Sequence, residues 1–206
     1  MPAVPPARLL IIRHGQSTWN AAHRWQGAAD PPLSPLGEAQ ARQAARALGE
    51  HTLEHVVTSP LRRAQRTAGL IAEALGLGEP HVVADLAERD VGEWTGLTRR
   101  EIEARWPGAL DPPHHDPPGG ETRDGFRDRV GQVLDELLEA HAGRTAAVVA
   151  HGGVIRAIEV ACGVEPGPIP NLVAWWVTGH PGAPEPGPRW QLVDPDARNA
   201  AMPMAP

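Results

Sequence analysis

Two histidines, His14 and His151, stand where a side chain could take part in chemistry. Each directly follows a strand-like run of mainly apolar residues, 9–13 and 146–150, and each is followed by glycine. Such runs are typical of strands buried on both faces of a parallel sheet. Ligands of open α/β sheets bind beyond the carboxyl ends of the strands. We therefore expect the two imidazoles to face one crevice, where a neutral imidazole can act as a nucleophile.

Arginines occur at the same strand ends. Arg13 adjoins His14, and Arg62 and Arg63 follow shortly after a strand predicted over 55–58. A guanidinium group stays charged and binds phosphate through two parallel hydrogen bonds. The helix predicted after His151 would also direct free N–H groups toward the crevice, which suits an anion. The sequence thus predicts a phosphate pocket in which an imidazole can attack phosphorus.

Apolar periodicity and turn signals predict the strands and helices that position these groups. Ser34-Pro35 and Ser59-Pro60 each combine an N-cap residue with a proline in the first helical turn. We expect an α/β fold of three layers, in which helices flank a mostly parallel central sheet with an antiparallel pair at its edge. The predicted strands cover 8–13, 55–58, 81–84, 145–150, 173–178 and 189–193, with a Pro/Gly-rich loop between the last two; the predicted helices cover 34–48, 59–75, 98–106, 126–138 and 154–162, with an irregular loop at 107–120.

The composition excludes several classes of protein. The length suits one domain over 1–206, with flexible tails at 1–7 and 195–206. All 19 basic residues are Arg, which excludes Schiff-base and P-loop lysine chemistry. The single Cys excludes a disulfide framework and a cysteine-based zinc site, and is compatible with a reducing cytoplasm. The net charge of −6 disfavours a nucleic-acid partner. A membrane span is not expected, because no apolar run reaches ~20 residues. The N-terminus lacks the features of a signal peptide.

Five blocks of the sequence resemble, in order, the motifs of the histidine phosphatase superfamily, also called the phosphoglycerate mutase-like family. These blocks are RHGQSTWN at 13–20, SPLRRAQRTA at 59–68, LAERDVGEWTGLT at 86–98, GGET at 119–122 and VAHGGVIRA at 149–157. One Arg-His-Gly alone would be weak, but five ordered blocks over about residues 8–178 are specific. The resemblance implies a phosphoglycerate mutase-like fold.

The resemblance also implies roles for individual residues. His14 would become phosphohistidine, and Glu88 would donate a proton to the leaving group. A cationic His151 would stabilise the transition state. The family requires no metal, and we expect no cofactor for this protein. The phosphoryl group would be bound by Arg13 and by Arg63 rather than Arg62, and the substrate by Asn20, Gln26, Gly27 and Gly152.

The resemblance leaves three functions open. The first is a phosphatase that hydrolyses a small phosphorylated metabolite, as in short bacterial members of the family. The second is a cofactor-dependent phosphoglycerate mutase, and the third is a non-catalytic module that binds phosphorylated ligands. Mutases of the family are longer and carry an inserted segment after the acid block, whereas here only 96–120 separates that block from GGET. We therefore expect a cytoplasmic phosphatase whose specificity surface includes 107–120. Metal binding by His114 and His115 in that loop is not expected, and a homodimer remains open.

Overall fold

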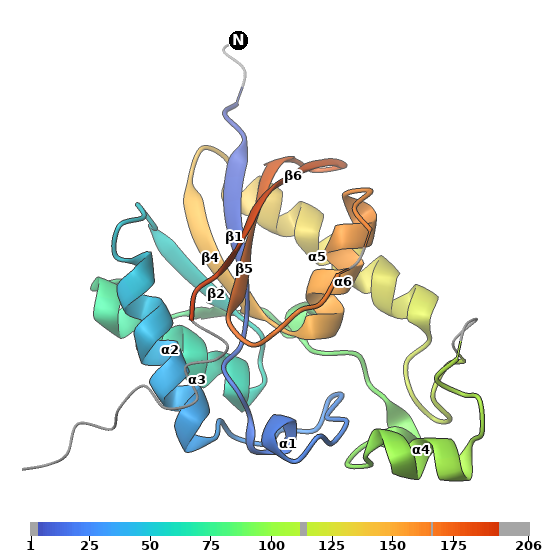
Figure 1. Ribbon diagram of the computed structural model, residues 1–206. Coiled ribbons are helices and arrows are strands. Elements are labelled where there is room, and N and C mark those ends of the chain that lie inside the picture. Colours follow the sequence, from blue (N-terminus) through green and yellow to red (C-terminus); the bar gives the residue numbers. More distant parts are fainter. Residues whose placement is uncertain (1–3, 112–114, 166, 194–206) are drawn as a thin grey trace, which may run out of the picture.

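A mixed sheet runs through the centre of the protein (Figure 1). The computed structural model describes residues 4–111, 115–165 and 167–193. Within them the sheet has six strands in the order β3-β2-β4-β1-β5-β6. The first four strands in this order are parallel, and β5 and β6 add an antiparallel edge, as the sequence predicts. The strands are β1 (Ala7–Arg13), β2 (His55–Thr58), β3 (His81–Val82), β4 (Thr145–Ala150), β5 (Val173–His180) and β6 (Ala183–Gln191).

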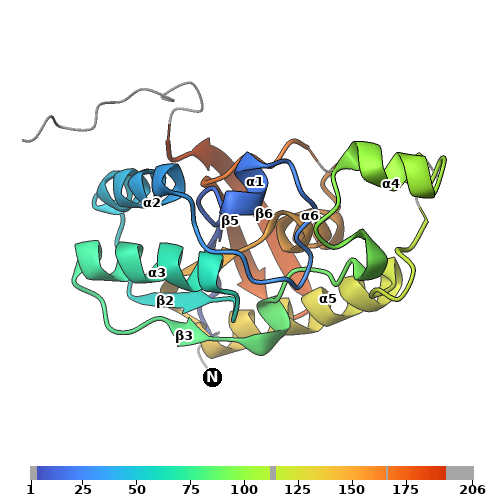
Figure 2. The same ribbon diagram turned by 90° about the horizontal axis from the view of Figure 1, so that it is seen from below.

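Helices cover both faces of the sheet and complete the three predicted layers. Figures 1 and 2 show α2 (Pro35–Leu48) and α3 (Arg62–Leu75) on one face, and α5 (Arg123–Ala140) and α6 (Gly152–Ala161) on the other. Two shorter helices, α1 (Thr18–Ala21) and α4 (Arg99–Arg105), lie beyond the carboxyl ends of the parallel strands. Two 3-10 turns, Ala84–Leu86 and Gly92–Trp94, precede α4.

The apolar run of β1 is buried from both sides. Leu10 and Ile12 pack in the cluster that contains α2 and α3, whereas Leu9 and Ile11 pack in the cluster that contains α5 and α6. All four side chains are fully buried. Successive side chains of a strand point to opposite faces, so a strand between two helical layers must be apolar at every position. This requirement explains why the run 9–12 has no polar residue.

A third, smaller hydrophobic cluster lies apart from the sheet. It is formed by Val91, Trp94, Ile102, Ala109 and Leu110, with Trp25, Leu97 and Trp106 packed against it. Most of these residues belong to the segment 91–111 around α4, which we call the α4 lobe. Figure 1 shows α4 at the lower right, well away from the layers of the sheet.

Helix α3 begins two to three residues later than predicted. Ser34 caps α2 as expected, because its side chain accepts a hydrogen bond from the Gly37 N–H. Ser59 does not cap α3; the N-cap is Leu61, which gives no side-chain hydrogen bond. The hydroxyl of Ser59 accepts from the N–H of Leu61, ahead of the helix, at 3.3 Å, and it also contacts His151. The capping interpretation of Ser59 was therefore wrong, because this side chain is engaged at the site described below.

Strand β6 covers most of the segment predicted as a Pro/Gly-rich loop. Its sequence APEPGPRWQ contains three prolines at alternate positions, 184, 186 and 188. Alternate residues of an edge strand direct their N–H groups to solvent, so proline is tolerated there. The prediction of a loop was wrong because β6 is the outermost strand of the sheet.

The chain ends differ in part from the expected tails. Ala7, predicted as part of the N-terminal tail, is the first residue of β1 and is fully buried. Residues 1–3 and the whole C-terminal tail 195–206 lie outside the described residues. Across the part of the chain that is described, no helix has the length and apolar character that crossing a bilayer requires.

Candidate active site

The carboxyl ends of β1 and β4 bring the two predicted histidines together. These strands are adjacent and parallel. The His14 N–H donates to the Ala150 carbonyl over 3.0 Å, which continues the ladder by one residue. The imidazole rings lie edge to face, with 5.1 Å between their centroids. Only 2% of His14 is exposed, and His151 is fully buried.

His14 is held as a neutral imidazole of defined tautomer. Its Nδ1 lies 2.6 Å from the Gly15 carbonyl oxygen, which can only accept a hydrogen bond. The proton must therefore be on Nδ1, and the lone pair is on Nε2. Burial, followed by the positive charges of Arg13 and Arg63, holds the pKa of His14 well below its ordinary value. The ring thus presents an unprotonated nitrogen at neutral pH.

Two arginines flank His14, the partly buried Arg13 and the buried Arg63. Arg13 donates to the Ile169 carbonyl. Arg63 donates to the carbonyls of Ala29 at 2.6 Å and Gly27 at 2.9 Å, and is only 1% exposed. The Nε–H of each arginine is buried without a hydrogen-bond partner among the described residues. A buried donor without a partner is costly, so these groups mark where an anion would fit.

The geometry distinguishes Arg63 from its neighbour Arg62, which is exposed. Burial lowers the pKa of Arg63 to about 10, although the carboxylates of Glu88 and Asp30 oppose this shift. Arg63 therefore remains a cation at neutral pH. The preference for Arg63 over Arg62 in the sequence agrees with this placement.

His151 lies next to His14, and its ring contacts Ser59. Its Nε2 is 2.6 Å from the Ser59 Oγ, and its Nδ1 is buried without a described partner. Burial, followed by His14, Arg63 and Arg13, holds the pKa of His151 well below its ordinary value. An imidazolium among these cations is disfavoured, so the ring is neutral in the free enzyme; the cationic His151 expected in the transition state stays a prediction.

Glu88 lies at the amino end of α6. Its Oε2 accepts from the Gly153 N–H at 3.0 Å, and its Oε1 accepts from the Arg89 N–H at 2.9 Å. A Cβ at position 153 would lie only 2.2 Å from the Glu88 Oε1, so glycine is required for this approach. The amino end of α6 was expected to offer only free N–H groups. One of them is instead occupied by Glu88.

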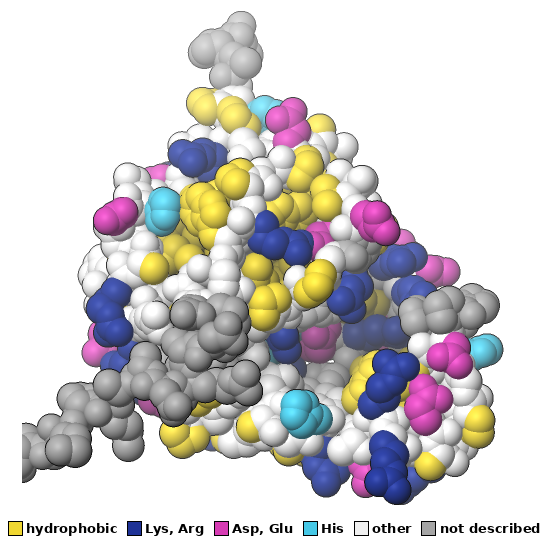
Figure 3. Space-filling model, in the orientation of Figure 1, with side chains coloured by type: hydrophobic (Ala, Val, Ile, Leu, Met, Phe, Trp, Pro, Cys, Tyr) yellow, Lys and Arg dark blue, Asp and Glu magenta, His cyan; other side chains and the backbone are white. Residues whose placement is uncertain are grey.

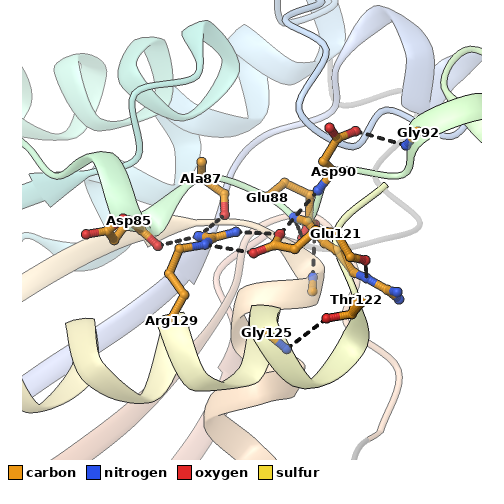
Figure 4. A network of polar contacts seen from close by, with 11 residues as sticks. Asp85, Ala87, Glu88, Asp90, Gly92, Glu121, Thr122, Gly125 and Arg129 are labelled. Atoms are coloured by element: carbon orange, nitrogen blue, oxygen red, sulfur yellow. Dashed lines mark hydrogen bonds and ion pairs between the residues drawn. The ribbon is translucent and has the colours of Figure 1, made fainter. Parts of the chain in front are cut away.

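A polar network holds the segment that carries Glu88 (Figure 4). Arg129 of α5 binds both carboxylate oxygens of Glu121, at 3.0 and 2.8 Å. The same guanidinium donates to the carbonyls of Asp85 and Ala87, at 2.6 and 3.0 Å. Residues 85 and 87 directly precede the acid, and Glu121 belongs to the GGET motif. This motif thus helps to fix the backbone beside Glu88.

The four predicted substrate-binding residues all line one cavity with His14. Asn20 completes the capping box of α1 by accepting from the N–H of the N-cap Ser17 at 3.1 Å, and Gln26 accepts from the Ser17 hydroxyl at 2.6 Å. Gly27 has a φ of +49°, which favours glycine, and its carbonyl binds Arg63. Gly152 packs close to Arg13. Their predicted place at the site is consistent with this arrangement.

The cavity has a volume of about 960 Å³ and lies between the sheet and the α4 lobe. Figure 3 shows a hollow in the surface at the lower right, with basic side chains around it. Trp25, Trp94 and Leu110 give the cavity an apolar side. Eight arginines line it, but among the described residues only one carboxylate does, that of Glu88; the arginines are Arg13, Arg24, Arg63, Arg89, Arg99, Arg123, Arg127 and Arg156.

The loop 107–120, expected to form part of the specificity surface, contributes to the lining of the cavity. Ala109, Leu110 and His115 line it, and Asp116 forms an ion pair with Arg89. His114 lies outside the described residues. Across those residues, no group of His, Cys, Asp and Glu side chains is arranged to hold a metal ion.

Sequence reasoning missed several residues that support the site. Asn171 donates to the His14 carbonyl at 2.9 Å. Thr67 accepts from the Gly15 N–H at 3.1 Å and donates to the Arg63 carbonyl at 2.8 Å. Ser59 and Thr67 lie within the second motif block, so their place in that block was the available signal. Asn171 follows a proline in a loop, and no local pattern indicates its role.

The chain is similar to several known proteins. Residues 9–172 match the histidine phosphatase superfamily, branch 1. A 2,3-bisphosphoglycerate-dependent phosphoglycerate mutase from Methylobacterium sp. (strain 4-46) is 40% identical over 192 residues, which cover 84% of this chain and 89% of the mutase. A metal-independent phosphoserine phosphatase from Arabidopsis thaliana is 39% identical over 157 residues, which cover 73% of this chain and 66% of that protein.

The fold is also similar to a solved structure. A mycobacterial glucosyl-3-phosphoglycerate phosphatase in complex with VO3 superposes with a TM-score of 0.80 and is 33% identical. The match covers 90% of this chain and 98% of that chain. Family match, relatives and fold agree, and the chain belongs to the histidine phosphatase superfamily, branch 1.

Proposed function

We propose that this protein is a metal-independent phosphatase that hydrolyses a small phosphorylated metabolite through a phosphohistidine at His14. The observation that carries the proposal is the state of His14. Its Nδ1 proton is bound by the Gly15 carbonyl, so the Nε2 lone pair is free beside the cations of Arg13 and Arg63. A neutral, oriented imidazole next to fixed positive charge is the arrangement that nucleophilic attack on phosphorus needs.

The first step transfers the phosphoryl group to the enzyme. The Nε2 of His14 attacks phosphorus as the bond between phosphorus and the ester oxygen breaks. Arg13 and Arg63, whose Nε–H groups are without partners, bind the phosphoryl oxygens. In this step the Ser59 hydroxyl donates to Nε2 of His151. The proton of the His151 ring is then on Nδ1, which donates to a phosphoryl oxygen. Preorganised donors of this kind are typically worth about 3–4 kcal/mol each in the transition state.

Glu88 supplies and recovers a proton. Its carboxyl group donates a proton to the departing ester oxygen, which leaves as an alcohol. Water then attacks the phosphohistidine and the bond between phosphorus and Nε2 breaks. The Glu88 carboxylate takes a proton from that water, so the enzyme returns to its starting state. The cavity opens to solvent between exposed residues such as His23 and Arg127, so water can reach the intermediate.

A mutase is the second candidate, because a relative with that name is 40% identical. Length does not separate this chain from that relative, since the match covers 89% of the mutase. In a mutase the phosphohistidine would phosphorylate a second hydroxyl group instead of water. The open cavity favours hydrolysis. Incubation of 3-phosphoglycerate with a catalytic amount of its bisphosphate distinguishes the two, because a mutase yields 2-phosphoglycerate faster than inorganic phosphate.

Trapping of the intermediate tests the proposal. The enzyme is mixed with a ³²P-labelled phosphate ester in EDTA and quenched in alkali after a short time. We expect an acid-labile adduct on His14, inhibition of turnover by vanadate, and loss of both adduct and turnover in His14→Ala. An active His14→Ala variant, or activity that EDTA abolishes and a divalent metal restores, would contradict the proposal.

A further inference from the structure

The turn that leads into β5 contacts the backbone of the proposed nucleophile. Residues 170–173 form this turn, and a hydrogen bond of 3.2 Å joins its last N–H to its first carbonyl. The Leu172 N–H donates to the Arg13 carbonyl at 3.1 Å. The side chain of Asn171 donates to the His14 carbonyl at 2.9 Å. One short segment, distant in the sequence, thus binds two successive carbonyls at the end of β1.

The backbone of this turn is strained at Leu172. Its φ is +57°, in the left-handed region that glycine usually occupies at the third position of such a turn. A leucine stays in this region only if its surroundings compensate the cost. The Leu172 side chain is fully buried in the cluster that contains α2 and α3, and its carbonyl accepts from the Leu192 N–H at 3.1 Å. Gln191 of β6 also donates to the Asn171 carbonyl at 3.0 Å. Packing and the end of β6 therefore hold the turn in one shape.

The side chain of Asn171 faces two acceptors. Its Nδ2 contacts the His14 carbonyl and also lies 3.4 Å from the Asn20 Oδ1. A primary amide carries two N–H donors on one nitrogen, so both acceptors can be served at once. The Asn20 Oδ1 in turn accepts from the Ser17 N–H at the start of α1. Asn171 thus connects the backbone of His14 with a residue that lines the cavity.

Asn171 itself does not border the cavity. The described residues that line it include His14 and Asn20 but not Asn171. Any effect of Asn171 on the reaction must therefore act through the residues it contacts. The His14 N–H is fixed by the Ala150 carbonyl, and its Nδ1 by the Gly15 carbonyl. The hydrogen bond from Asn171 fixes the remaining polar group of this residue, its own carbonyl.

We propose that Asn171 is a positioning residue that holds the His14 Nε2 in line with the phosphorus atom. Phosphoryl transfer needs the attacking and leaving atoms in line, and a misplacement of about 1 Å can cost about 10²-fold in rate. Without the amide of Asn171, the peptide group that follows His14 is free to rotate, and the imidazole moves with it. The loss should affect the attack by Nε2 and not proton donation by Glu88. This inference rests on the proposed phosphatase function, because it concerns the step that forms phosphohistidine.

Single-turnover rates with two esters test this role. Asn171→Leu keeps a similar shape without the donors, and Asn171→Ala removes them with less bulk. We expect phosphohistidine to form about 10–100-fold more slowly, because the nucleophile is misplaced. The factor should be the same for glycerol 3-phosphate and 4-nitrophenyl phosphate, since misalignment slows the attack whatever group leaves. Circular dichroism and urea unfolding identify the variants that are folded at the assay temperature.

Vanadate measures the same alignment without turnover. Vanadate becomes five-coordinate when the His14 Nε2 binds it, as phosphorus does in the transition state, whereas sulfate needs only the arginines. In Asn171→Leu the affinity for vanadate should fall about tenfold and that for sulfate should stay within about twofold. A mainly structural role of Asn171 would not change the ratio of the two affinities.

Gln65→Leu is the matched control. Gln65 is an exposed residue of α3 whose side-chain amide also donates to a backbone carbonyl, that of Pro60, at 2.8 Å. Its loss should leave the rates and both affinities unchanged. Unchanged rates in the folded Asn171 variants, a larger loss for glycerol 3-phosphate, or equal losses of vanadate and sulfate affinity would overturn the inference. Failure of both variants to fold would also overturn it, because Asn171 would then serve the fold. A wild-type enzyme that hydrolyses neither ester would instead overturn the proposed function.

Discussion

Glu88 is the residue whose proposed role depends most on a single proton. An alkoxide is a poor leaving group, so its oxygen needs a proton as the bond to phosphorus breaks, whereas nitrophenolate leaves readily as an anion. Glu88→Gln should therefore slow hydrolysis of glycerol phosphate by about 10²–10⁴-fold and that of 4-nitrophenyl phosphate much less. Single-turnover rates at fixed pH measure both.

A second variant separates proton donation from a general loss of structure. Gly153→Ala leaves Glu88 chemically intact, but its Cβ would meet the carboxylate, at 2.2 Å from the Oε1. We expect the same dependence on the leaving group in this variant, because the carboxyl group is displaced. A loss that is equal for both substrates in Glu88→Gln would mean that Glu88 only positions the substrate.

Motif residues and supporting residues differed in how well sequence could predict them. His14, Arg13, Arg63 and Glu88 stand in blocks whose order is specific, and the structure brings them together. The protonation state of His151 could not be predicted, because it depends on how deeply the ring is buried and on cations from other segments.

At the scale of elements, the connection between α5 and the segment before Glu88 makes a prediction. The Arg129 side chain joins α5 to Glu121, Asp85 and Ala87 by hydrogen bonds. In Arg129→Gln these hydrogen bonds are lost, and Glu88 should move relative to His14. A misplacement of about 1 Å can cost about 10²-fold in rate. We expect a loss of this order for glycerol phosphate and a smaller loss for nitrophenyl phosphate.

The control for Arg129→Gln must distinguish position from stability. Hydrogen bonds to charged groups contribute about 1.5–3 kcal/mol, so the variant should also unfold at lower urea concentration. Arg129→Lys restores the positive charge but not the planar guanidinium with its paired N–H donors. We expect this variant to recover stability more fully than the ratio of rates for glycerol phosphate and nitrophenyl phosphate. If the variant loses stability yet shows an unchanged ratio of rates for the two substrates, the network only stabilises the fold.

Strands buried between two layers were the elements that sequence predicted best. The runs in β1 and β4 are apolar at every buried position, which only such strands require. The edge strand β6 was missed because its prolines resemble a loop, and the start of α3 was misplaced because Ser59 has a tertiary partner. Local patterns do not carry either piece of information, since both depend on the neighbours of the segment.

At the scale of the whole molecule, the net charge does not show where the charged side chains lie. A charge of −6 disfavours a nucleic-acid surface, as it does for any acidic protein. It gives no indication that eight of the 19 arginines line one cavity. Folding must gather these cations against their mutual repulsion, and it must bury His14 and His151 among them. The energetic consequence should be visible as a dependence of stability on pH and on anions.

Stability should fall on acidification because of the two buried histidines. Their pKa values in the folded protein lie well below the value near 6.5 of an unfolded chain. Below pH 6.5 the unfolded chain therefore binds more protons, and the free energy of unfolding decreases as pH falls; above about pH 7 this contribution is constant. Each histidine can add a slope of up to about 1.4 kcal/mol per pH unit. Urea unfolding between pH 5 and 8 measures the sum.

Sulfate distinguishes the site histidines from other acid-sensitive groups. Sulfate stays a dianion over this range, so its own charge does not change. A dianion bound by Arg13 and Arg63 should raise the pKa of both imidazoles, because it offsets the cations that now lower it. The stabilisation by 10 mM sulfate should thus be larger at pH 5.5 than at pH 7.5.

The double variant His14→Gln, His151→Gln is the control, and in it the difference between the two pH values should disappear. The dependence of the free energy of unfolding on pH below pH 6.5 should decrease but not vanish, since His141 also has a lowered pKa. Equal stabilisation by sulfate at both pH values in the wild type would mean that the histidines take up no proton when an anion binds.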